Sequence, residues 1–382
     1  MARDEKPYRI YRAGRTKSKA PVSVGGAGLG AGSAGPERYR GPGAARRPAH
    51  WGRRIAIGLA ALLVLLIAWG IAGWLAFSSG VSDANRRLDP NAKVALAKQN
   101  GLLFSTPSTI LLLGTDNAAT SGRAGDEHSD SIMLMRTDPQ RHRIYYLSIP
   151  RDIVVPIPGH GTQKINAAMQ DGGPALAIAT IGQFTGLPID HVVVVNFADF
   201  KTLIDRLGGI TVNVPKPILS DRFDCPFATQ ARCLEWRGWR FAKGPQHMDG
   251  ERALIYSRIR VNQLDPSESD VTRGARQQAV MQAVLSKFTS PLVLLKLPFD
   301  GSSLAKPLTT DMSAGELMQF GWVRFRASGS VHCRLGGDFG AGGNGAPSED
   351  NPATIAMFLG KSAPQLPTST YGPGCVAGHP LQ

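Results

Sequence analysis

The stretch Ile55–Phe77 carries no charged residue over 23 consecutive positions. A bilayer core of about 30 Å is crossed by about 20 helical residues, so this run can span a membrane as one helix. Arginines precede the run and tryptophans lie towards its ends: Arg46, Arg47, Arg53, Arg54, Trp51, Trp69 and Trp74. The positive-inside rule then places the N-terminus in the cytoplasm and residues after about 80 outside the cytoplasmic membrane. We predict an uncleaved single-pass anchor, because a cleaved signal peptide has a shorter apolar region.

The net charge of +14 is concentrated before this anchor. Residues 1–54 carry 13 Lys and Arg residues against 3 Asp and Glu, whereas the rest of the chain carries 30 against 26. The basic character therefore belongs to a Gly-, Ala-, Pro- and Arg-rich tail, which we expect to be disordered. It gives no reason to expect that the folded part binds nucleic acid.

Strand and helix patterns alternate after the anchor. Strands are predicted at 108–113, 130–136, 144–149, 189–197 and 210–214, and helices at 174–184, 199–207, 249–256 and 270–288. The alternation indicates an α/β domain. Its sheet is expected to be mixed, because a short polar connection at Asp138-Pro139 predicts an antiparallel hairpin. The run 189–197 is almost continuously apolar, as in a strand buried on both faces.

The pattern weakens after Pro298. A capping box, Ser313 to Glu316, predicts one more helix, and we expect loops over 327–350 and 361–382. All four cysteines lie on the predicted external side, where disulfides are permitted. Cys225 with Cys233 could close a short loop, and Cys333 with Cys375 a long one. A zinc site is disfavoured, because the sequence has no C-x-x-C pair.

The densest group of polar residues runs from Tyr256 to Gln278. It holds Arg258, Arg260, Arg273, Arg276, Asp270, Gln277 and Gln278 within 23 positions. A guanidinium forks onto phosphate oxygens, so the group reads as a phosphate clamp, with a solvated charged loop as the alternative.

The helix that follows favours the clamp. Arg273 and Gln277 continue the apolar stripe of this helix towards its N-terminus, which attracts anions. If Arg258 and Arg260 serve one site, the preceding helix should end near Tyr256, because residues two apart share a face only on an extended segment.

Charged residues also stand at the ends of predicted strands: Asp116, Asp130 and Arg151. Two aspartates could hold one Mg²⁺, the arginines could bind phosphates, and the third carboxylate, Asp270, could take a proton from an attacking hydroxyl. These are the parts needed for phosphoryl transfer. For each aspartate alone, helix capping or a salt bridge is the competing interpretation. Walker A, G-x-S-x-G and H-E-x-x-H motifs do not occur in the sequence.

The segment from 110 to 288 resembles the LytR-CpsA-Psr family of membrane-anchored cell-envelope proteins. The matching stretches occur in the family's order: ILLLGTD (110–116), SDSIMLMR (129–136), YLSIPRD (146–152), KIN (164–166), LIDRLGGITVNV (203–214), MDGERALIYSRIR (248–260) and DVTRGARQQ (270–278). The resemblance implies a three-layer α/β/α sandwich around a mixed central sheet, with an apolar pocket for a lipid tail. It further implies transfer of a glycopolymer from a polyprenyl-pyrophosphate carrier to a peptidoglycan hydroxyl.

The resemblance also implies residue roles. Asp116 and Asp130 match the Mg²⁺-associated aspartates, and Asp270 matches a carboxylate that could activate the acceptor. The set that would bind pyrophosphate is Arg151, Arg258, Arg260, Arg273 and Gln277. Arg258 and Arg260 are expected to be catalytic as well. The resulting organisation is a tail (1–54), an anchor (55–77), a stalk (78–107), a catalytic domain (108–290) and a C-terminal extension (291–382).

Two departures from the family pattern bear on these roles. His128 stands where the family usually has arginine, which replaces a permanent charge by a titratable one. Ten positions separate Arg260 from Asp270 where about seven are common in the family, so a longer loop precedes the expected base. Two other functions stay open: a non-catalytic envelope or regulatory protein, and a hydrolase that uses water on the same lipid pyrophosphate.

Overall fold

The computed structural model describes residues 51–115, 129–227, 229–265, 268, 270–339, 345–369 and 372–380. The chain divides into two compact units, residues 1–57 and 58–382, and the described fold belongs almost entirely to the second. The predicted disordered tail lies outside the described residues up to position 50, as do Asp116 and His128.

The predicted anchor forms a helix, α1 (Trp51–Arg87), of 37 residues. Its most apolar window has a mean hydropathy of 2.7 and is not buried, so α1 is long and apolar enough to cross a membrane. The helix continues past Phe77 into the predicted stalk. There Val81 and Ala84 are buried, as is Leu88 in the turn before α2 (Pro90–Ala95). The stalk is therefore packed onto the folded unit.

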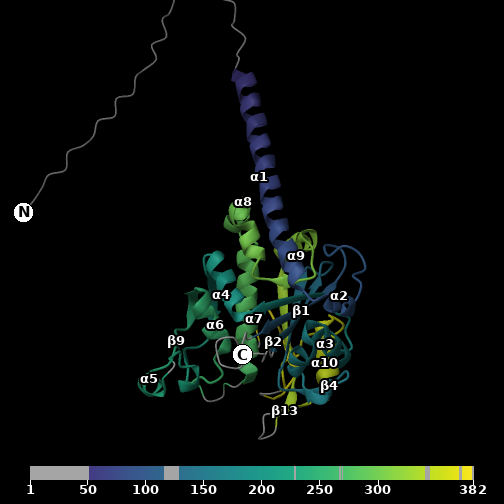
Figure 1. The fold of residues 1–382 in the computed structure, drawn as a ribbon, viewed down its shortest axis with the longest axis vertical. Coiled ribbons are helices and arrows are strands. Elements are labelled where there is room, and N and C mark those ends of the chain that lie inside the picture. The colour runs from purple at the N-terminus through teal and green to yellow at the C-terminus, as the bar shows by residue number, and fades with distance from the viewer. Residues whose placement is uncertain are drawn as a thin grey trace, which may run out of the picture. The chain divides into compact units, whose positions relative to one another are not determined.

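A mixed seven-stranded sheet forms the centre of the fold (Figure 1). Its order is β11-β6-β1-β2-β3-β12-β15, with β1 and β3 antiparallel to β2, β6 parallel to β1, and β12 parallel to β3. The predicted hairpin is thus confirmed as β2–β3. The strands are β1 (Ser108–Thr115), β2 (Ser129–Asp138), β3 (Arg143–Ile149), β6 (His191–Asn196), β11 (Thr309–Thr310), β12 (Gly329–Arg334) and β15 (Gly374–Ala377).

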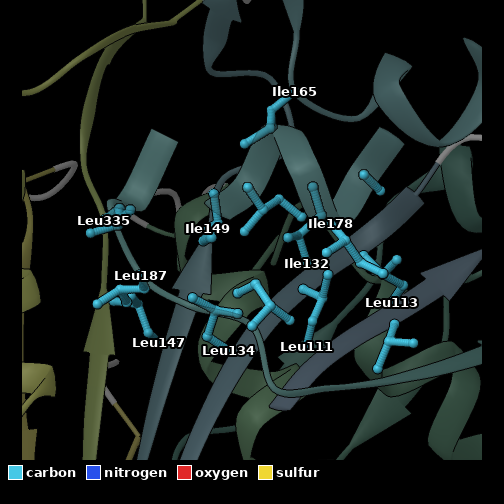
Figure 2. Close-up of a cluster of buried hydrophobic side chains, with 14 of the residues drawn as sticks. Leu111, Leu113, Ile132, Leu134, Leu147, Ile149, Ile165, Ile178, Leu187 and Leu335 are labelled. Carbon is cyan, nitrogen blue, oxygen red and sulfur yellow. The ribbon is translucent and has the colours of Figure 1, made fainter. Parts of the chain in front are cut away.

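Both faces of this sheet are covered, which explains the uninterrupted apolar run in β1. Leu111 and Leu113 point to a core shared with Leu134 and Leu147 (Figure 2). On that face lie α3 (Ala167–Thr185) and α10 (Asn351–Phe358). The alternate residues of β1 face a second core beneath α7 (Asp270–Phe288) and α9 (Ala314–Arg326). The predicted α/β/α sandwich is confirmed, and the Ser313 capping box of α9 is formed.

A separate group of elements packs beside the second face around its own apolar cluster. The expected strand 210–214 forms as β7, but it pairs with β10 in a ribbon outside the central sheet. The elements of this group are α4 (Phe197–Arg206), β7 (Ile210–Val214), β8 (Ile218–Leu219), β9 (Arg240–Phe241), β10 (Gly244–Met248), α6 (Gly250–Arg258) and α8 (Pro291–Ala305). The other short elements are β4 (Val154–Ile157), β5 (Gly161–Lys164), η2 (Arg222–Asp224), α5 (Gln230–Glu235), β13 (Gly337–Phe339) and β14 (Gly345–Pro347).

The expectation of loops over 327–350 and 361–382 is wrong at the strands β12, β13, β14 and β15, whereas residues 361–369 form neither helix nor strand, as expected. Strand β12 lies inside the central sheet, and β15 pairs with it at the edge. The sequence hides β12 because buried His332 and Arg334 interrupt its apolar pattern. Both have partners: His332 Nδ1 lies 2.9 Å from Gln278 Oε1, and Arg334 Nε donates to the Gly372 carbonyl at 3.0 Å. The cysteines form both of the suggested disulfides, Cys225–Cys233 and Cys333–Cys375.

Candidate functional site

A cavity of about 700 Å³ lies between the second face of the sheet and α7, α8 and α9. This size is ordinary for a ligand-binding pocket. Strands β1, β2 and β6 form one wall and α7 forms the opposite wall. The polar side chains on its lining are Asp130, Ser131, Asp224, Ser257, Arg258, Arg260, Arg273, Gln277, Thr289 and Arg324.

Polarity changes along the cavity in the same direction on both walls. On α7, Arg273 and Gln277 come first, and apolar residues such as Met281 follow at the next turns. On β2, Asp130 and Ser131 precede the apolar lining residues. Ser131 Oγ donates to Gln277 Oε1 at 3.0 Å, which joins the two polar ends. The cavity therefore has a polar end at the start of α7 and an apolar end towards α8.

The predicted arginine pair lies at the polar end. Helix α6 begins at its N-cap Asp249, whose carboxylate accepts from Arg252 N at 2.8 Å. It ends at Arg258, two residues later than expected. Both Arg258 and Arg260 nevertheless line the cavity, because the chain leaves helical geometry at Ile259. The Arg258 guanidinium also stacks over the Phe197 ring of α4, with its Cζ atom 4.6 Å from the ring centroid.

Arg151 contacts the site indirectly, through Asp130 on the cavity wall. Its Nη1 donates to Oδ1 of Asp130, and both side chains are largely buried. Its Nε lies 3.4 Å from Asp152, which also binds Lys164 at 2.9 Å. Arg151 is not part of the cavity lining, so it balances the charge of Asp130 from behind the wall.

The loop between the two arginine-bearing helices is held by a buried ion pair. Arg276 donates to Glu268 Oε2 and to the Ile259 carbonyl, and Asn262 Nδ2 donates to Glu268 Oε1 at 3.0 Å. Arg276 thus belongs to the support of the site rather than to its lining. Asp270 is the first residue of α7, and its side chain lies outside the described residues, as does Asp116.

The donor set for a metal is only partly described. Asp130 places a carboxylate on the cavity wall, and carboxylate oxygens are the protein ligands that Mg²⁺ prefers. Strand β1 ends at Thr115, which pairs with Ser129 of the strand that carries Asp130, and Asp116 lies outside the described residues. Within the described residues, no group of three or more His, Cys, Asp and Glu could hold a metal ion.

Asp224 is a cavity residue that sequence reasoning missed. It lies in the irregular segment between β8 and β9, next to the Cys225–Cys233 disulfide. Its Oδ2 is buried without a hydrogen-bond partner. Burial, and then the nearby charge of Asp221, raise the pKa of Asp224 to about 6, although Arg258 and Arg260 oppose the shift. An aspartate beside a cysteine in an insertion carries no spacing signal, so only the fold reveals it.

The apolar end is formed by α1, α8 and α9 together with the later turns of α7. Phe77 of α1, Leu294 and Leu297 of α8, and Trp322 and Phe325 of α9 line it. None of these five side chains carries a charge. The cavity as a whole suits an amphiphile with an anionic head and an apolar tail.

The chain matches the family model described as LytR_cpsA_psr over residues 72–330. A curated relative from Bacillus subtilis (strain 168), named polyisoprenyl-teichoic acid--peptidoglycan teichoic acid transferase TagV, is 32% identical over 240 residues. That match covers 62% of this chain and 58% of the relative. The chain therefore spans less than two thirds of that relative's length.

Solved structures share the fold. The structure titled TagT bound to LIIa-WTA superimposes with a TM-score of 0.54 at 25% identity, covering 70% of this chain and 96% of that one. A second, titled LytR-CPS2A-psr family protein YwtF (TagT) with bound octaprenyl pyrophosphate lipid, gives a TM-score of 0.50 at 25% identity with the same coverage.

Proposed function

The chain belongs to the LytR-CpsA-Psr family, and from this premise we propose that it transfers a glycopolymer from a polyprenyl-pyrophosphate carrier to a hydroxyl of peptidoglycan. The observation that carries the proposal is the cavity itself. Three arginines and a glutamine line one end together with Asp130 and Asp224, and mainly apolar side chains line the rest. A prenyl pyrophosphate has the same division between a doubly charged head and a hydrocarbon tail.

The reaction is a displacement at phosphorus. The acceptor oxygen attacks the phosphorus next to the sugar, its proton passes to the Asp270 carboxylate, and the bond to the bridging oxygen breaks. Polyprenyl phosphate leaves with the electron pair of that bond. Arg258, Arg260 and Arg273 bind the phosphate oxygens, where negative charge grows in the transition state.

Mg²⁺ is the proposed cofactor. Asp130, together with Asp116, would hold it, and it would neutralise charge on the pyrophosphate when bound. The proposed placement of the enzyme is the outer side of the cytoplasmic membrane, with α1 as the single anchor. Its proposed partners are therefore the lipid-linked glycan, peptidoglycan and the membrane.

The test uses the full chain in nanodiscs with a labelled lipid-pyrophosphate oligosaccharide, peptidoglycan and Mg²⁺. We expect label on the peptidoglycan and release of polyprenyl phosphate, and loss of both when Mg²⁺ is chelated. Arg260→Ala should abolish most of the transfer, whereas Arg240→Ala, an exposed arginine outside the cavity, should leave it intact.

Other outcomes would decide against transfer. Phosphate release without labelled peptidoglycan would indicate a hydrolase. Tight donor binding without turnover, unchanged by Arg260→Ala, would indicate a non-catalytic protein. Transfer that persists undiminished after chelation would remove Mg²⁺ from the proposal and leave the arginines as the source of charge stabilisation.

A further inference from the structure

Two helices at the apolar end of the cavity expose large apolar side chains. On α8, Leu292, Leu295 and Phe299 are 67%, 61% and 73% exposed. On α9, Trp322 and Phe325 are 57% and 66% exposed. Large apolar patches on a folded unit usually mark a surface that something covers.

Helix α8 packs directly against α1, beside the end of the uncharged run (Figure 1). The rings of Trp69 and Phe299 meet edge to face with centroids 5.2 Å apart. A Cβ atom at Gly80 would lie 2.4 Å from the Ser302 carbonyl oxygen, so only glycine permits this approach. The exposed side of α8 is thereby continuous with the part of α1 that can cross a membrane.

The outer and inner sides of α8 are both apolar. Leu294 and Leu297 line the cavity, whereas Leu292, Leu295 and Phe299 do not. A helix that carries large apolar side chains on two opposite sides is normally in contact with protein or with lipid on both. Among the described residues, Leu292 and Leu295 stay exposed although Phe299 packs against Trp69. Beside a helix that is long and apolar enough to cross a membrane, lipid is the surrounding that suits such side chains.

The charges around the patch fit a membrane surface. Lys296 on α8 is exposed, as is Arg326 at the end of α9, and the half-buried Arg324 lies beside it on the same helix. Tryptophan with basic residues is typical of the interface between acyl chains and headgroups, where cations meet anionic lipids. A soluble protein partner would not require this position beside the anchor.

We propose that α8 and α9 are embedded in the membrane interface, so that the apolar end of the cavity opens into the acyl-chain layer. The ligand is a membrane lipid with a long hydrocarbon chain, which enters sideways from the bilayer with its tail never exposed to water. The identity of that lipid as a prenyl pyrophosphate rests on the proposed function, but the embedding does not.

The first test measures immersion of the two helices. The described cysteines are all paired, so a cysteine introduced at Leu295 offers the free thiol for a nitroxide label. Leu234 on α5, 56% exposed and away from α1, gives the matched control (Figure 1). In nanodiscs containing phosphatidylglycerol, we expect the label at 295 to be relaxed by oxygen and shielded from a water-soluble nickel chelate, and the label at 234 to show the reverse.

Two results would overturn the embedding. Equal access of the nickel chelate to both positions would mean that α8 is in water. Shielding of the label at 295 from both reagents would mean that protein, such as a second copy of the chain, covers it.

The second test concerns entry of the lipid. Leu295→Asp should slow transfer from a long-chain donor held in the nanodisc by about tenfold, because it opposes immersion of α8. It should not slow transfer from a water-soluble short-chain donor, and Leu234→Asp should affect neither. If wild-type protein uses neither donor, the proposed function fails while the label result still decides the embedding. If Leu295→Asp leaves long-chain transfer unchanged, lateral entry is wrong.

Discussion

The two ends of the cavity are built in opposite ways. The polar end gathers few side chains from distant parts of the chain, and several are held in place: Ser131 by Gln277, Asp130 by Arg151, and Arg258 by an aromatic face. The apolar end is lined mainly by apolar side chains from α1, α7, α8 and α9, which offer contact area but no hydrogen bonds. The polar end can therefore recognise a defined group, whereas the apolar end can accept a chain of variable length.

The two ends differ because hydrogen bonds depend on direction and burial of hydrocarbon does not. Forked hydrogen bonds from guanidinium groups depend on angle and distance, so a displaced arginine loses most of its contribution. Burial of hydrocarbon depends on area and has no direction. We therefore expect substitutions at the polar end to act mainly on the rate of transfer, and substitutions at the apolar end mainly on affinity for the tail.

The largest effect is expected from Arg258→Ala. Loss of one group that stabilises the charge of a transition state costs about a hundredfold to a thousandfold in rate, so kcat for transfer should fall by that factor. Arg258→Lys keeps the charge but not the fork and should fall in between. Rates with the lipid-linked donor measure this, with Tm as a check on folding. Equal activity of the alanine and lysine variants with wild type would remove Arg258 from the reaction.

A smaller effect is expected at the apolar end from Leu285→Trp. The indole would occupy part of the cavity and displace about two methylene groups of the tail, which weakens binding about tenfold. The Kd for a long-chain donor measures this, and a short-chain donor should bind unchanged. Leu366→Trp, at an exposed position outside the cavity, is the control. An equal loss with both donors would mean that the tail does not lie against Leu285.

The smallest effect is a pH dependence from Asp224. Its pKa of about 6 means that the carboxyl group is neutral below this pH and negative above it. The added negative charge opposes an anionic pyrophosphate, so affinity for a lipid-pyrophosphate sugar should fall as pH rises through about 6. A half-buried charge is worth about 1 kcal/mol or less, so the change is about fivefold at most. In Asp224→Asn this step should disappear, and a step that persists would belong to another group.

Much of the fold follows from the sequence because its signals are local. The charge-free run, the β2–β3 hairpin, the capping box at Ser313 and the stripe of α7 each depend on neighbours within a few residues. The strands β12 and β15 do not. The polar residues of β12 become acceptable only when Gln278 and the Gly372 carbonyl approach from elsewhere, and β15 forms only by pairing with β12, so local patterns predict loops there.

The candidate site divides in the same way. The sequence predicted five site residues that line one cavity in the structure: Asp130, Arg258, Arg260, Arg273 and Gln277. It also supplied Arg151, but could not show that this residue contacts Asp130 from behind the wall. The roles of Asp116 and Asp270 remain predictions. Asp224 could not be found, because its burial arises from packing of an irregular segment against the arginines.

The sequence by itself determined that the chain has an apolar run long enough to cross a membrane, an α/β domain and a cluster of arginines at the start of a helix, because periodicity and charge are set by consecutive residues. Only the tertiary structure decided that the cluster opens onto an apolar cavity, and that α8 lies along α1 at its far end. Cavities and close approaches such as Gly80 to Ser302 depend on residues more than 200 positions apart, and no local pattern encodes them. The phosphate clamp is thereby specified locally, whereas its apolar extension towards α1 is a property of the whole fold.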